Sequence, residues 1–84
     1  MFWVYVLVSD RTGRTYVGST QDVTARFAQH NSGQSKSTRH GVPWRLVYQQ
    51  SFATRAEAVR HERYLKTGKG REELSRLIDE AHAR

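Results

Sequence analysis

The sequence predicts an α+β (mixed α/β) fold, in which a three-stranded antiparallel sheet is flanked by helices in the order ββαβαα. Three short segments are rich in the β-branched and aromatic residues of strands, and three others repeat apolar residues at helical spacing. No internal repeat, low-complexity stretch or linker separates them, and 84 residues can bury only one hydrophobic core. We therefore expect a single domain over residues 1–84.

The first two strands are predicted at residues 2–8 and 15–20. Residues 2–8 are continuously apolar, which is typical of a strand buried on both faces, so we expect this strand at the centre of the sheet. Residues 10–14 have turn chemistry, with Gly13 available for a positive φ, and they predict a β-hairpin.

The turn of this hairpin decides which side chains share a face of the sheet. A two-residue turn at residues 11–12 would place Tyr5 opposite Gly18 and Leu7 opposite Tyr16. Both tyrosines and Gly18 would then lie on one face, with an uncrowded patch beside the two phenols. A glycine inside a strand permits close approach or marks a β-bulge, and both interpretations are open. Paired strand tyrosines alone are more often core residues.

The first helix is predicted from a cap at Thr20 or Asp22 to a helix end at residues 31–33. Four residues recur at helical spacing and share one stripe: Val23, Arg26, Phe27 and His30. Arg26 and His30 thus point toward the sheet. A charged group there costs free energy of folding unless it has a polar or oppositely charged partner or serves in a functional site. They form either a functional site at the junction of helix and sheet, or simply a pair of polar residues at the border between core and surface.

The chain then returns to the sheet through a polar loop. Residues 32–42 hold Lys36, Arg39 and His40, so we expect this loop to be mobile and basic. The third strand is predicted after Pro43, at residues 44–52, from its alternating pattern.

Two more helices complete the predicted order. The second begins with a capping box of Thr54 and Glu57 and is expected to end where Gly68 and Gly70 break it. The third, amphipathic helix is predicted at residues 72–83, with acidic residues in its first turn.

Glu62 lies on the apolar side of the second predicted helix. Ala58, Val59 and Leu65 are within three or four residues of it, so its carboxylate should lie near the edge of the core. An ion pair with an arginine is the interpretation that this residue alone favours. The alternative is a hard divalent cation such as Mg²⁺, which accepts few protein oxygens and retains waters.

Charge predicts the kind of partner. The chain carries a formal net charge of +6 with a pI near 10.3, and no carboxylate lies between Asp22 and Glu57. Such a basic tract favours a nucleic-acid partner, because cations that neutralise phosphates release counterions, although many small basic proteins are simply soluble. Exposed cations of the hairpin, the loop and the third strand would follow the phosphate backbone: Arg11, Arg14, Lys36, Arg39 and Arg45.

Composition also excludes several classes of function. The absence of cysteine excludes disulfide scaffolds, thiolate catalysis and sulfur-ligated zinc, and it suits a reducing, cytoplasmic setting. The apolar residues 2–8 are too few to span a bilayer, so we expect no membrane partner. The sequence sets no expectation for an accessory protein or a homodimer.

Two short motifs carry a family resemblance. Trp3-Val4-Tyr5 and Tyr16-Val17-Gly18 resemble the paired strand motifs of the GIY-YIG endonuclease superfamily, and the order and spacing of the other elements are similar over essentially all 84 residues. The chain looks most like the short, stand-alone branch, which is similar to the catalytic module of structure-selective nucleases. The resemblance implies a metal-dependent endonuclease that hydrolyses phosphodiester bonds in DNA, more than in RNA, with DNA repair as a setting.

The resemblance also implies a role for each matching residue. One Mg²⁺ or Mn²⁺ ion would be the cofactor. Tyr5 and Tyr16 would be the site tyrosines and Gly18 the close-packing glycine next to the nucleic acid. The remaining roles are phosphate binding for Arg26, proton handling for His30 and metal ligation for Glu62. Because nothing in the sequence resembles a base-reading helix, we expect selectivity for the structure or strand, without sequence specificity.

The chain departs from the family pattern at three places. Trp3 replaces the glycine of the first motif, Ser19 stands where some repair members have lysine, and no asparagine follows Glu62. The missing asparagine leaves a non-catalytic nucleic-acid-binding module of the same fold as the chief alternative. The third possible function is that of a protein-interaction domain, in which Arg26 and Glu62 form a salt bridge at the edge of the core.

Overall fold

The computed structural model describes residues 1–82. Its sheet is antiparallel and consists of β1 (Phe2–Ser9), β2 (Thr15–Thr20) and β3 (Trp44–Phe52), in the order β2-β1-β3. The predicted central position of β1 is confirmed, and residues 4 to 9 of this strand are buried on both faces. The predicted α+β class and the order ββαβαα are confirmed as well.

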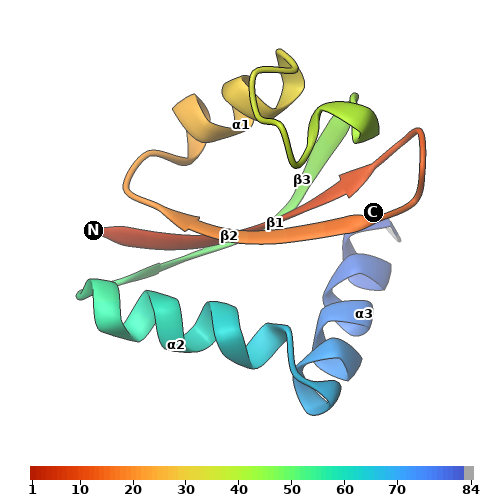
Figure 1. Cartoon of the computed structure of the whole chain (residues 1–84). Helices are drawn as coiled ribbons and strands as arrows, with labels where there is room; N and C mark the ends of the chain where they lie inside the picture. The colour runs from red at the N-terminus through yellow and green to blue at the C-terminus, as the bar shows by residue number, and fades with distance from the viewer. Residues whose placement is uncertain (83–84) are drawn as a thin grey trace.

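Helices cover both faces of the sheet (Figure 1). One face is covered by α1 (Val23–Asn31), and the other by α2 (Arg55–Leu65) and α3 (Gly68–His82). A short 3₁₀ helix, η1 (Arg39–Gly41), lies in the loop between α1 and β3. No helix within residues 1–82 is long and apolar enough to cross a membrane.

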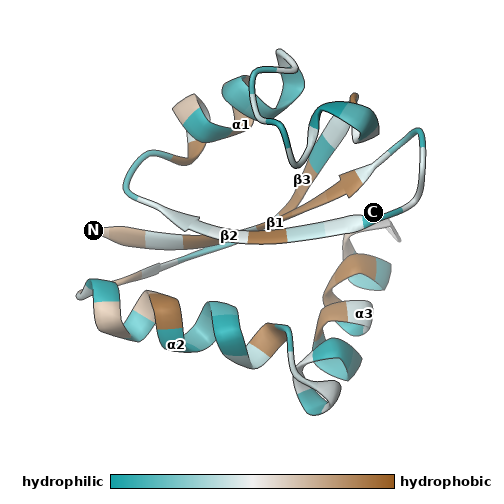
Figure 2. Cartoon of the chain, viewed as in Figure 1, coloured by the Kyte–Doolittle hydropathy of each residue, from teal (hydrophilic) through white to brown (hydrophobic). Residues whose placement is uncertain are grey.

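Two clusters of buried side chains lie on the two faces, because successive residues of a strand point in opposite directions. Val4 and Val6 pack against α2 and α3, in a cluster with Leu65. Tyr5 and Leu7 belong to the cluster on the α1 face. Figure 2 shows hydrophobic residues along β1 and hydrophilic residues over much of the helices on both sides of the sheet, so the apolar interior follows the central strand.

The hairpin has the predicted register, with Tyr5 opposite Gly18 and Leu7 opposite Tyr16. Its turn is longer than predicted. The last backbone pair is Ser9 with Arg14, and Gly13 adopts a φ of +76° while its N–H donates to the Ser9 carbonyl (3.0 Å). The longer turn leaves the register unchanged because its four residues are centred on the same point.

The first helix follows its sequence prediction. Asp22 is its N-cap, and Oδ1 of this residue accepts a hydrogen bond from the Ala25 N–H (3.0 Å). Val23 and His30 are buried, and Arg26 is half-buried on the same stripe, while the other faces of the helix are exposed. The spacing therefore predicted correctly which polar residues this helix turns toward the sheet.

Part of the loop at residues 32–42 packs against the rest of the fold. Thr38 and Gly41 are buried, and the Ser9 hydroxyl donates to the Gly41 carbonyl (2.6 Å). The Asn31 side chain bonds both the N–H and the carbonyl of Trp44. These contacts involve segments that are distant in sequence, so local composition does not predict them.

The boundary between the last two helices also differs from the prediction. The capping box is present, since the Thr54 hydroxyl accepts from the Glu57 N–H (3.2 Å), and α2 ends at Leu65. However, α3 begins at Gly68 and includes Gly70, because this glycine lets the first turn of α3 pack directly on the last turn of α2. The predicted last residue of this helix, Ala83, lies outside the described residues.

Candidate active site

The two strand tyrosines lie together on the α1 face of the sheet. Their ring centroids are 6.1 Å apart, and Tyr5 is 1% exposed whereas Tyr16 is half-buried. The strand pairing continues in register through Gly18. A Cβ atom at Gly18 would lie 2.6 Å from the Tyr5 hydroxyl oxygen and 3.0 Å from a ring carbon of Tyr16. The glycine therefore makes room for the phenols, which fill the space that the sequence predicted to be uncrowded.

His30 joins these tyrosines from α1. It is fully buried, and its Nε2 is hydrogen-bonded to the Tyr5 hydroxyl at 2.9 Å. Its Nδ1 is hydrogen-bonded to the Thr38 hydroxyl at 2.8 Å, and the ring centroid of Tyr16 is 4.8 Å away. Both ring nitrogens thus have partners, and a continuous chain of hydrogen bonds runs through Tyr5, His30 and Thr38.

The surroundings of these groups change their acidity. Burial raises the pKa of the Tyr5 phenol to about 12, the nearby Tyr16 adds to this rise, and the nearby Arg26 guanidinium opposes it. Burial also lowers the pKa of the His30 imidazole, and the positive charge of Arg26 lowers it further. At neutral pH the chain of hydrogen bonds therefore consists of a neutral phenol, a neutral imidazole and a hydroxyl.

The lowered pKa of His30 predicts how stability depends on pH. The unfolded chain binds the histidine proton near pH 6.5, whereas the folded chain resists it, so this contribution is complete above pH 6.5 and is lost as pH falls below it. We expect the free energy of unfolding to fall by at most about 1.4 kcal/mol per pH unit from this one group. Urea unfolding between pH 5 and 8 measures it.

A matched pair of variants identifies the group responsible. His30→Gln should flatten the dependence above pH 5, where few carboxylates titrate, whereas His40→Gln, which changes an exposed histidine, should keep it. An unchanged slope in His30→Gln would assign the dependence to other groups.

Arg26 lies on the rim of this cluster. It is half-buried, and one of its terminal nitrogens donates to Oε1 of Gln29 (2.7 Å). Its charge acts on both Tyr5 and His30, as their pKa values record. The predicted inward stripe of α1 therefore brings Arg26 and His30 to the tyrosine pair.

A cleft of about 560 Å³ opens beside the half-buried tyrosine. Tyr16 lines it, together with Thr38, Arg14 and Trp44. His40, from η1, lines the same cleft. Tyr16 is thus the tyrosine that solvent and a substrate can reach from this side, while Tyr5 lies behind it.

Glu62 lies where its helical spacing predicts, at the edge of the core. Its side chain is 21% exposed, and Oε2 accepts a hydrogen bond from Nζ of Lys66 (2.8 Å), one turn further along α2. The predicted alternative of a salt bridge between Arg26 and Glu62 is not the arrangement in the described residues, since Arg26 bonds Gln29. The i, i+4 spacing of Glu62 and Lys66 is the sequence signal that identifies the true partner.

Glu62 approaches the sheet from the face opposite to the tyrosines. One turn before it, Ala58 and Val59 line a hollow with Ser19, and one turn after it Lys66 lines another with Val17. Glu62 therefore lies beneath the β2 edge, level with the middle of that strand. The tyrosine cluster and the carboxylate flank this edge from its two sides.

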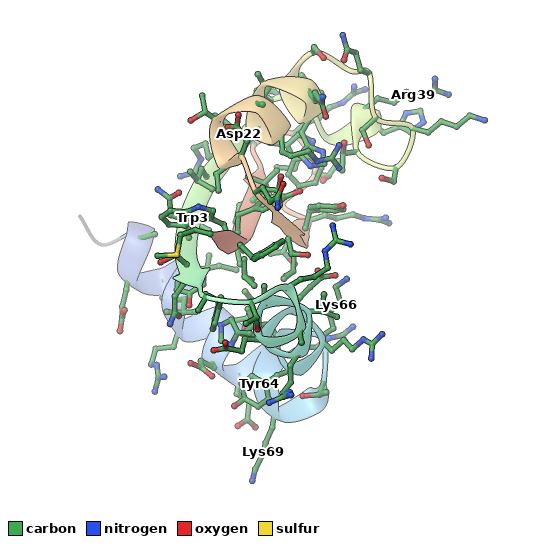
Figure 3. All side chains as sticks on the ribbon, turned by 90° about the vertical axis from the view of Figure 1, so that its left-hand side faces the viewer. Trp3, Asp22, Arg39, Tyr64, Lys66 and Lys69 are labelled. Carbon is green, nitrogen blue, oxygen red and sulfur yellow. The ribbon has the colours of Figure 1, made fainter. Side chains whose placement is uncertain are left out.

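The cations predicted to follow a phosphate backbone are all exposed, but they differ in their surroundings. Arg14 lines the cleft beside Tyr16. Arg11 and Lys36 lie in the hairpin turn and the loop, and Figure 3 shows Arg39 on the α1 side of the molecule. Arg45 forms an ion pair with Asp10 at 2.6 Å, which reduces the charge that it presents to a polyanion.

Comparisons with known proteins identify the family of this chain. Residues 1–74 match the GIY-YIG catalytic domain family. A UPF0213 protein of Streptococcus pneumoniae serotype 4 is 44% identical over 68 residues, which cover 80% of this chain and 68% of that protein. A UPF0213 protein of Staphylococcus aureus strain Mu3 is 40% identical over 79 residues, 93% of this chain and 94% of that protein.

A solved structure is similar as well. The solution NMR structure of the UPF0213 protein BH0048 from Bacillus halodurans matches with a TM-score of 0.54 and 37% sequence identity, over 92% of this chain and 85% of that one. Both the family match and the relatives cover most of the described elements. The chain therefore belongs to the GIY-YIG catalytic domain family, a nuclease family, and within it to the UPF0213 proteins.

Proposed function

We propose that this chain is a metal-dependent endonuclease that hydrolyses phosphodiester bonds in DNA, selecting the structure or strand of its substrate and not its sequence. One observation carries the proposal: two tyrosines, His30 and Arg26 converge on one face of the β1–β2 hairpin, beside an open cleft. Hydrolysis needs positioned charge and a path for protons, and this cluster offers both. The predicted setting is a single domain in the cytoplasm.

The two tyrosines would have different tasks. Tyr16 borders the cleft, so it is the phenol that would contact the attacking water or the phosphate. Tyr5 is buried with a pKa near 12, which makes it a poor base at neutral pH. We therefore assign Tyr16 to the reaction and Tyr5 to its support.

The support would come from the chain of hydrogen bonds behind Tyr16. Two arrangements of its protons are possible. In the first, the Tyr5 hydroxyl donates to Nε2 of His30, and the Nδ1–H of His30 donates to Thr38. In the second, the Thr38 hydroxyl donates to Nδ1 of His30, and the Nε2–H of His30 donates to the Tyr5 oxygen. The second arrangement leaves the Tyr5 proton free to turn toward its neighbours. Exchange between the two would need one proton to enter at the Tyr5 oxygen and one to leave from the Thr38 hydroxyl, which lines the cleft. Such a concerted shift keeps the imidazole neutral, in agreement with its lowered pKa.

Arg26 would supply fixed positive charge to the phosphoryl group, and Glu62 would hold one Mg²⁺ or Mn²⁺ ion. Glu62 offers one carboxylate at the edge of the core, and a hard cation such as Mg²⁺ accepts few protein oxygens and keeps its waters. Among residues 1–82 no three His, Asp or Glu side chains gather as a metal cage. When bound, such an ion stabilises negative charge on phosphoryl and leaving oxygens. Lys66 occupies the same carboxylate, so the ion would have to displace its ammonium group.

A cleavage assay tests the proposal. Flapped, branched and single-stranded DNA should be cut with Mg²⁺ or Mn²⁺, and chelation with EDTA should stop the reaction. Tyr16→Phe should lower the rate by about 10²-fold or more, because it removes a group that handles a proton in the transition state. Tyr64→Phe, which changes an exposed tyrosine of α2, is the control and should cut like the parent protein.

Two results would contradict the proposed chemistry: cutting that persists in EDTA, or a Tyr16→Phe variant with full activity. The second candidate is a non-catalytic nucleic-acid-binding module, and the missing asparagine after Glu62 favours it. Its signature would be salt-dependent binding of DNA without cutting in either metal.

A further inference from the structure

A small hollow lies under the β2 edge, on the opposite side of Tyr16 from the cleft. Its volume is about 210 Å³, and its apolar lining comes from Val17, Leu65 and Leu74. Lys66 and Arg71, from the junction of α2 and α3, line it as well. We call it the β2-edge hollow.

The charge of this hollow is positive. Arg71 is exposed and forms no ion pair with any residue that the structure describes. Lys66 is about half exposed and shares its charge with one carboxylate, that of Glu62. The acidic residues next to Arg71 in the chain, Glu72 and Glu73, do not line this hollow.

The hollow adjoins the cleft of the candidate active site. Thr15 and Tyr16 line both, so Tyr16 forms their common wall. Cations are present on either side of it, with Arg14 in the cleft and Arg71 in the hollow. Figure 3 shows two other cations on opposite sides of the sheet, Arg39 on the α1 side and Lys66 on the α2 side.

We infer that the β2-edge hollow is a second nucleic-acid contact, in which Lys66 and Arg71 bind a backbone phosphate. A strand that crosses the β2 edge would then be held on both sides of Tyr16. This inference rests on the proposed function and deepens it, because it defines the path of the substrate across the site.

The chemistry of the hollow suits a nucleotide. A planar guanidinium binds a phosphate with two parallel hydrogen bonds, and an ammonium binds it as a point charge. The aliphatic lining could contact the apolar surface of the sugar. None of these groups reads a base edge, so the contact would add affinity and direction without sequence preference.

Binding in EDTA tests this inference apart from cleavage. A fluorescent single-stranded oligonucleotide is titrated with the parent protein, Arg71→Ala and Lys69→Ala at several salt concentrations. One phosphate contact contributes about 0.7 to the slope of log affinity against log salt, which is about fivefold in affinity at 0.1 M salt. Arg71→Ala should lower both the slope and the affinity by these amounts. This substitution leaves the ion pair of Glu62 and Lys66 intact. Lys66→Ala should have a similar effect.

Lys69→Ala is the matched control. Lys69 is three residues after Lys66, does not line the hollow, and extends away from the sheet in Figure 3. Lys69→Ala should change the slope of log affinity against log salt by less than half as much as Arg71→Ala does. Equal losses in all three variants would indicate only a general effect of charge and would overturn the inference, as would unchanged binding in Arg71→Ala. Circular dichroism should confirm that each variant is folded.

The outcomes also separate this inference from the proposed nuclease activity. If the parent protein cuts DNA but Arg71→Ala binds normally, the hollow is not a contact and the nuclease proposal stands. If the parent protein never cuts and Arg71→Ala still loses the expected slope, the hollow is a contact of a non-catalytic binding module.

Discussion

Replacing Glu62 with glutamine should reduce the rate of DNA cleavage by about 10³-fold or more, while DNA binding stays within a fewfold of the parent protein. The substitution keeps the size of the side chain and removes the charge that would hold the metal ion. A metal at a phosphoryl group supplies several kcal/mol of transition-state stabilisation, and each 1.36 kcal/mol is a factor of about ten in rate. Single-turnover cleavage with saturating enzyme measures the effect.

The control for this experiment is Glu80→Gln. Glu80 is an exposed carboxylate of α3 that lines a hollow with Tyr48, away from the tyrosine cluster. It should cut at the parent rate. Higher Mg²⁺ or Mn²⁺ concentrations should rescue Glu62→Gln only weakly, because an amide oxygen replaces a carboxylate. A Glu62→Gln protein that cuts at the parent rate would remove this residue from the mechanism.

Replacing Gly70 with alanine should destabilise the protein by about 3 kcal/mol or more, at the upper end of what overpacking costs. A Cβ atom at this position would lie 1.7 Å from the carbonyl oxygen of Tyr64 and 2.7 Å from Cα of Leu65. Both are backbone atoms, which cannot rotate away, so α3 would have to move off α2. Leu74 would then lose its place in the core beside Leu65.

Thermal unfolding measures this effect, and Gly68→Ala is its control. For a domain of this size 1 kcal/mol corresponds to about 4–8 °C, so Gly70→Ala should melt more than about 10 °C below the parent protein. Within the described part of the chain, nothing lies within 4 Å of a Cβ at Gly68, in the same helical turn. Alanine there should be neutral or slightly stabilising, because it restricts the unfolded chain. Equal melting temperatures for the two variants would contradict the proposed packing.

Local patterns were sufficient for most of the fold. The apolar run of β1 indicated a strand buried on both faces, and the position of the turn set which residues of β2 oppose it. The stripe on α1 identified His30 and Arg26 as residues that face the sheet. Each of these features depends on residues close together in sequence, because strand alternation and helical periodicity are local properties of the backbone.

Other features depend on contacts between distant segments, which spacing does not show. The partner of His30 in the loop, Thr38, was missed because a polar loop gives no sign that one hydroxyl will be buried against α1. Local pattern predicts Gly70 to be a helix breaker, whereas it lies inside α3 and allows the close approach of α2. His40 also enters the cleft only through the position of η1.

The sequence by itself therefore predicted the three strands and three α-helices of this protein, their order along the chain, and the five residues proposed for its site. The tertiary structure decided how these five divide: four converge on the α1 face, while Glu62 approaches from the other face and pairs with Lys66. The physical reason is that periodicity specifies the direction of a side chain relative to its own helix or strand. The position of its polar end group in the fold, and the residue that pairs with its charge, depend on how the helices pack on the two faces of the sheet.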